Sequence, residues 1–97
     1  MPSQSVLVVI EIDSVNDPQS LKVYQAAARE QMLARGARVI ARGGSMIEGE
    51  PAFGSLLLQE WPSEEAFREW QGSAEYAPYK RLRQLAAKMR ICVMSGV

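Results

Sequence analysis

The spacing of hydrophobic positions changes along the chain in a way that indicates strands alternating with helices. Residues 6–12 form an apolar, β-branched run typical of a strand, and both of its alternating sets stay apolar up to Glu11. After Asp17, a good N-cap residue, and Pro18, apolar residues recur at helical spacing until Gly36 ends the pattern. The remaining pattern predicts strands at residues 37–42, 53–61 and 90–94, and helices at residues 64–71 and 78–88.

The order of these elements predicts an α+β fold of ferredoxin-like βαββαβ type, with an extra helix before the last strand. We expect one domain over residues 1–97. Right-handed crossovers place the helices on one face of a four-stranded antiparallel sheet whose strand order is 4-1-3-2. Residues 53–61 also fit a helix, but Phe53, Trp61 and the following Pro62 favour a strand.

Hydrophobic residues on both alternating sets of the predicted strands indicate a second buried face. The helices can cover only one face of such a sheet, so either assignment of the sets leaves an apolar patch in water. Stacking two sheets would remove this patch at about 25 cal/mol per Å² of apolar area. We therefore expect a homodimer with two-fold symmetry that forms a dimeric α+β barrel.

Composition narrows the possible chemistry. Eleven basic and eleven acidic residues give a net charge of zero, which argues against a nucleic-acid or membrane-surface partner. The chain has no histidine, which excludes a Ser-His-Asp or Cys-His hydrolase and disfavours zinc, so we expect neither metal nor cofactor. Cys92 is the single cysteine and is expected to be a small buried hydrophobe in a reducing, cytoplasmic protein.

Two glutamates are the candidates for acid–base catalysis. Glu11 interrupts an apolar strand, and Glu60 ends a strand expected to neighbour the strand that carries Arg42. Burial beside a cleft would raise the pKa of such a carboxyl group and suit it to proton transfer. The alternative is a structural ion pair with Arg42 or Arg90, or a solvated position at the rim.

Five residues are the candidates for ligand binding. Arg42, followed by two glycines, would suit an anion, although the same glycines also fit a turn that ends a strand. Tyr24, Trp70 and Tyr76 lie on predicted inner helix faces, where they would either line a pocket or simply fill the core. Arg83 would face inward toward Tyr24 or a ligand carboxylate, or be an ordinary base near a helix end.

A series of short motifs occurs in order along nearly the whole chain. They are Asp17-Pro18 followed by Tyr24, Arg42-Gly43-Gly44, Glu48-Gly49, Trp61-Pro62-Ser63 followed by Ala66 and Trp70, Ser73-Ala74-Glu75-Tyr76 followed by Tyr79 and Arg83, and Gly96. Together they make the chain resemble domain-of-unknown-function family 1330, a branch of the dimeric α+β barrel superfamily. Many members of that family have phenylalanine where this chain has Trp61.

The resemblance implies a homodimer whose two sheets form a barrel, and it implies no established activity. The wider superfamily includes cofactor-independent monooxygenases, muconolactone isomerases, haem-degrading enzymes and haem-dependent peroxidases. The lack of histidine counts against the haem-binding branches. These are analogies at the level of the fold.

The leading functional hypothesis is a dimer that binds a small acidic or aromatic metabolite. If it is an enzyme, it would be a cofactor-independent isomerase, decarboxylase or oxygenase, with Glu11 or Glu60 as acid–base and a tyrosine as hydrogen-bond donor. The alternative is a non-catalytic structural or regulatory homodimer. A cavity of about 300 Å³ or more with converging polar groups favours the first hypothesis, and a filled core favours the second.

Overall fold

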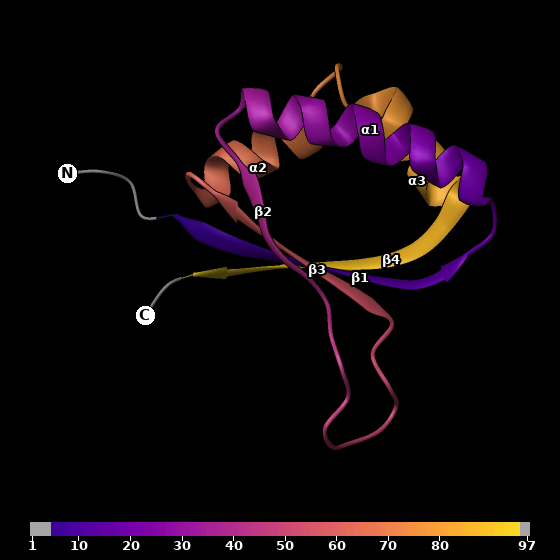
Figure 1. Ribbon diagram of the computed structural model, residues 1–97. Coiled ribbons are helices and arrows are strands. Elements are labelled where there is room, and N and C mark those ends of the chain that lie inside the picture. Colours follow the sequence, from indigo (N-terminus) through magenta and orange to yellow (C-terminus); the bar gives the residue numbers. More distant parts are fainter. Residues whose placement is uncertain (1–4, 96–97) are drawn as a thin grey trace.

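The computed structural model describes residues 5–95, within which three helices cover one face of a four-stranded antiparallel sheet (Figure 1). The strand order is β2-β3-β1-β4, so the predicted ferredoxin-like topology and the extra helix before the last strand are confirmed. Gly96, the last residue of the motif series, lies outside the described residues. The elements are β1 (Val6–Val15), α1 (Pro18–Ala34), β2 (Arg38–Gly43), β3 (Ser55–Trp61), α2 (Glu64–Gln71), α3 (Ala77–Ala86) and β4 (Ala87–Ser95).

Local capping signals determine where two of the helices begin. The Asp17 carboxylate accepts a hydrogen bond from the backbone N–H of Ser20 at 3.2 Å, and Pro18 occupies the first turn of α1. The Ser63 hydroxyl accepts the N–H three residues further on at 3.0 Å, which starts α2. After α1, Gly36 adopts a φ of 86°, a conformation that suits glycine. These predicted boundaries are therefore confirmed.

The junction of α3 and β4 differs from the prediction. The sequence predicts a helix to about Lys88 and a strand over residues 90–94, but α3 ends at Ala86 and β4 begins at Ala87 with no loop between them. The backbone N–H of Asn16 donates to the Ala86 carbonyl at 2.7 Å, and Ala87 pairs with the end of β1. Sheet pairing therefore overrides the helical preference of this segment.

Strand register decides which side chains point toward the helices. Val8 of β1 lies opposite Gln59 of β3 and Val93 of β4, and it is completely buried beneath the helices. Alternation along β1 places Ile10 and Ile12 on the same helix-covered face.

The other face of the sheet is not covered by any helix in the described residues. Leu7 and Val9 point to this side and are only partly buried. Cys92 lies opposite Val9 on the same side and is exposed, so the prediction of a buried cysteine is wrong. We call this side the open face; its strand residues are Leu7, Val9, Glu11, Arg38, Ala41, Gly43, Leu56, Leu58, Glu60, Arg90, Cys92 and Met94.

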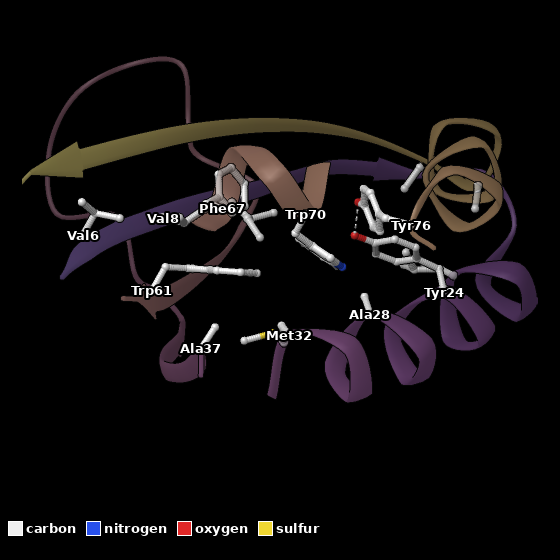
Figure 2. Packing of buried hydrophobic residues seen from close by; sticks show 14 residues of the cluster. Val6, Val8, Tyr24, Ala28, Met32, Ala37, Trp61, Phe67, Trp70 and Tyr76 are labelled. Carbon is white, nitrogen blue, oxygen red and sulfur yellow. Dashed lines mark hydrogen bonds between the residues drawn. The ribbon is translucent and has the colours of Figure 1, made fainter. Parts of the chain in front are cut away.

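Aromatic side chains join the helices to the sheet. Trp61 at the end of β3 packs against Phe67 and Trp70 of α2, each with a ring-centroid distance of 5.2 Å (Figure 2). Trp70 in turn packs against Tyr76 at 4.0 Å, and Tyr76 reaches Tyr24 of α1 at 6.1 Å. Rings of this size bury about 150–250 Å² each, so this chain of contacts stabilises the whole helix layer.

Gly54 is required by a close approach of two backbone segments. A Cβ atom at this position would lie 2.2 Å from the Ile12 carbonyl oxygen, whereas a Cβ at Gly72 would meet nothing closer than 3.6 Å. We expect Gly54→Ala to lower the free energy of unfolding by about 1–3 kcal/mol through overpacking. The control Gly72→Ala should change it by less than about 0.5 kcal/mol. Urea unfolding of both variants measures the difference, and equal midpoints would contradict the predicted clash.

Candidate functional site

A cavity of about 320 Å³ lies between the sheet and the helices. Ile10, Leu57 and Ile91 from three adjacent strands form part of its floor, and α1 contributes Ala28 and Met32 to the opposite wall. Such a mostly apolar lining with a few polar groups is typical of small-molecule sites. The core is therefore not completely filled by its own side chains.

The structure places three of the five predicted ligand-binding residues in this cavity. Tyr24, Arg42 and Trp70 contribute to its lining. Tyr76 lies behind Tyr24 and packs on Trp70, while Arg83 is buried outside the lining. Three of the five candidates therefore line the cavity, and the other two, Tyr76 and Arg83, lie behind the lining.

A β-bulge gives Arg42 its position in the cavity. Val39 pairs with Gln59, but the next pairs are Ala41 with Leu58 and Arg42 with Leu57, so the register shifts by one residue. The extra residue places Arg42 on the same face as Leu57, where simple alternation from Val39 would have placed Ala41.

Four polar lining residues, Gln25, Arg29, Gln59 and Gln71, were missed by the sequence analysis. Arg29 of α1 lines the cavity one residue after the buried Ala28, so it borders the apolar stripe rather than belonging to it. Gln59 is buried in the floor, and its side-chain oxygen accepts a hydrogen bond from the Trp61 indole at 2.9 Å. The available signal for Gln59 was its place in the alternating set of Leu57 and Trp61, where a polar residue is unusual.

Tyr24 provides a neutral hydroxyl group at the cavity wall. Its oxygen lies 2.7 Å from the Tyr76 hydroxyl oxygen, which is a hydrogen bond between two buried phenols (Figure 2). Burial raises the pKa of Tyr24 far above its usual value, the neighbouring Tyr76 adds to this, and the Arg83 charge partly opposes it. Tyr24 therefore suits a hydrogen-bond donor rather than a base.

Arg83 is a buried cation beside this tyrosine pair. Its side chain is 8% exposed, and its Nη1 atom has no hydrogen-bond partner within the described residues. Of the two alternatives that the sequence left open for Arg83, the structure has the inward orientation toward Tyr24. A charge in such a position contributes to the field around the tyrosine hydroxyls.

Glu11 and Glu60 both lie on the open face, away from the cavity. Glu11 accepts a hydrogen bond from the Gly54 backbone N–H at 2.8 Å and pairs with Arg90. Glu60 pairs with Arg38 at 2.9 Å. The structural ion pairs weighed for these residues are therefore present, although Glu60 is paired with Arg38 and not with Arg42. An acid–base role for either glutamate stays a prediction.

The sequence comparison decides the family. Residues 5–97 match the family described as Domain of unknown function (DUF1330). The chain belongs to this family. The family match confirms the resemblance that the motifs indicated. No curated protein matches the DUF1330 chain.

Solved structures similar to this DUF1330 chain support the fold. The RPA0582 protein of unknown function from Rhodopseudomonas palustris is 17% identical, with a TM-score of 0.79 over 98% of this chain and 84% of that one. A dimeric protein of unknown function with a ferredoxin-like fold from Bacteroides fragilis is 14% identical, with a TM-score of 0.54 over 99% and 100%. SnoaB, a cofactor-independent oxygenase from Streptomyces nogalater, is 12% identical, with a TM-score of 0.59 over 97% and 94%.

Two further features of residues 5–95 bear on chemistry. No three His, Cys, Asp or Glu side chains in this part of the DUF1330 chain come together to hold a metal ion. No helix there is long and apolar enough to cross a membrane.

The environment of Glu11 predicts a pH-dependent stability. The Gly54 hydrogen bond and then Arg90 hold the pKa of Glu11 below its ordinary value of 4.5. A lowered folded-state pKa contributes stability above pH 4.5, and this is lost as the pH falls through the folded-state pKa. We expect Glu11→Gln to unfold at lower urea than the unmodified protein at neutral pH, with the gap closing in acid.

The matched control for this experiment is Glu69→Gln. Glu69 is exposed and makes no ion pair within residues 5–95. Its variant should follow the unmodified protein at every pH. A gap between Glu11→Gln and the unmodified protein that stayed constant into acid would contradict the predicted role of the Glu11 charge.

Proposed function

We propose that this DUF1330 protein binds a small acidic or aromatic metabolite in the cavity beneath α1. The observation that carries the proposal is a cavity of about 320 Å³ with apolar walls, two arginines in its lining and no acidic residue there. A ligand with an apolar body and a negative group complements this combination of walls and charge.

The predicted binding residues have distinct roles in this proposal. Trp70 offers an aromatic surface, Arg42 offers a cation, and Tyr24 offers a hydroxyl group. Tyr76 and Arg83 act behind them, because Tyr76 holds the Tyr24 hydroxyl through a hydrogen bond and Arg83 adds positive charge near it.

The same residues suit cofactor-independent chemistry if the ligand is a substrate. A neutral tyrosine hydroxyl that resists ionisation donates a hydrogen bond to a carbonyl oxygen and stabilises negative charge that develops on it. SnoaB, a cofactor-independent oxygenase, has a similar fold at 12% identity, and this likeness concerns the fold and not the reaction. If the bound metabolite is a substrate, we therefore propose that the reaction is an isomerisation, a decarboxylation or an oxygenation.

Ligand binding is tested by thermal unfolding with a panel of aromatic and short aliphatic carboxylates. A compound at 100 times its Kd stabilises the folded state by about 2.7 kcal/mol, which raises the unfolding temperature by several degrees. We expect some of these compounds to do so and to change tryptophan fluorescence, because Trp70 lines the cavity.

A variant that fills the cavity tests whether the compounds bind there. Ala28→Phe places a ring in the cavity and should abolish the shift, whereas Ala34→Phe, at an exposed position on the same helix, should preserve it. Circular dichroism verifies that both variants fold. The absence of a shift with every compound would favour the non-catalytic structural or regulatory homodimer, and an unchanged shift in Ala28→Phe would contradict binding in the cavity.

We also propose that two chains pair through their open faces. Four aliphatic residues of this face, Leu7, Val9, Leu56 and Leu58, are only partly buried in the single chain. The loop between β2 and β3 projects to the side away from the helices (Figure 1) and carries Ile47, which is 93% exposed. A second copy would cover both features, and the similar protein from Bacteroides fragilis is described as dimeric.

Light scattering tests this pairing. The unmodified protein should have twice the chain mass of 10.8 kDa, and Leu58→Asp should reduce the mass to that of one chain by burying a charge in the interface. Leu85→Asp is the control, because Leu85 is 77% exposed but lies on α3. A mass near 10.8 kDa for the unmodified protein at micromolar concentration would refute the dimer.

A further inference from the structure

The exposed Arg29 and Arg42 line the cavity at the β2 edge of the sheet, and we call this place its mouth. A groove along β2 shares four wall residues with the cavity, namely Arg29, Met32, Val39 and Arg42, and continues along the exposed strand. Because β2 is an edge strand and Arg29 and Arg42 are exposed, the interior meets solvent along this shared wall. A ligand that enters here keeps one end near the surface and places the other beneath α1.

Two arginines from different elements stand at this mouth. Arg29 comes from α1 and Arg42 from β2, and both are exposed members of the shared wall. Neither forms an ion pair or side-chain hydrogen bond within residues 5–95, in contrast to Arg38 on the same strand, which pairs with Glu60. With no acid in the cavity lining, both guanidinium groups are available to an anion.

The inner part of the cavity offers no comparable charge. Apart from the two arginines the lining is mostly apolar and aromatic, and its remaining polar residues, Tyr24, Gln25, Gln59 and Gln71, carry no charge. The Gln59 oxygen accepts a hydrogen bond from the Trp61 indole and, as an acceptor, does not attract an anion. An ionised group placed there would lose its hydration with no charged lining residue to pair with, since the buried Arg83 lies behind Tyr24 and outside the lining.

We propose that Arg29 and Arg42 form a clamp for one carboxylate at the mouth, so that the ligand is a small monocarboxylate whose apolar body enters first. The planar guanidinium groups match the geometry of a carboxylate and bind it with charge-assisted hydrogen bonds. A dicarboxylate is disfavoured because its second charge would lie in the apolar interior. This clamp rests on the proposed ligand-binding function and assigns both the orientation and the charge of the ligand.

Calorimetric titration with two probes tests the clamp. Phenylacetate carries one carboxylate on an aromatic body, and phenylacetamide has nearly the same shape without the charge. We expect phenylacetate to bind the unmodified protein at least tenfold more tightly than phenylacetamide, as charge-assisted hydrogen bonds require. Arg29→Gln and Arg42→Gln should each weaken phenylacetate about tenfold or more while leaving phenylacetamide unchanged.

The control is Arg81→Gln, because Arg81 is exposed and lies outside the cavity lining. This variant should bind both probes like the unmodified protein. Equal binding of the two probes, with no effect of the Arg29 and Arg42 substitutions, would overturn the clamp while leaving the proposed ligand-binding function intact. Binding of neither probe, together with no response to the wider carboxylate panel, would overturn the proposed function and the clamp with it.

Discussion

The packing of Trp70 against Tyr76, at 4.0 Å between ring centroids, is the contact on which the arrangement of helices and sheet depends. Trp70 also contacts Trp61 of β3, and Tyr76, which precedes α3, hydrogen-bonds to Tyr24 of α1, so this one aromatic pair connects every helix to the sheet. These large rings lie between α1 and the strands (Figure 2). Where α1 presents the small side chain of Ala28 instead, the space is not filled and the cavity remains.

Each face of the sheet serves one of the two proposed functions, ligand binding on the helix-covered face and dimerisation on the open face. The helix-covered face holds the cavity and its arginines, while the open face holds ion pairs such as Glu11 with Arg90 among partly buried aliphatic residues. The ion pairs satisfy the charges of the open face within the chain. The same arrangement leaves Arg29 and Arg42 without carboxylate partners in the described chain and accessible to a bound anion. A ligand and a second subunit would thus occupy opposite surfaces of one layer.

Features encoded by local signals were predictable from the sequence. The order of strands and the capping roles of Asp17 and Ser63 each follow from neighbouring residues or from the chirality of crossovers. Tyr24 and Trp70 were predictable as inward residues because helical spacing identifies a face without knowledge of its partner.

Features that depend on tertiary register were not predictable. Periodicity could not assign Arg42 to the cavity, because a one-residue bulge in β2 exchanges the two faces after Val39. Cys92 was assigned to the core because an apolar strand pattern does not distinguish the side that helices cover from the side they leave open. Arg29 was missed because a charged residue beside an apolar stripe is ordinary unless a cavity opens next to it.

The direct connection of α3 to β4 has a consequence for how chains of this fold can vary in length. Ala86 and Ala87 are both buried, and the Ala86 carbonyl accepts backbone hydrogen bonds from Asn16 and Asp17. An added residue at this corner would break those bonds and displace a strand that pairs with β1 over most of its length. Insertions and deletions are accommodated far more easily in the long exposed connection between β2 and β3. Divergence in chain length would therefore remodel the periphery of the sheet and leave the helix–strand corner constant.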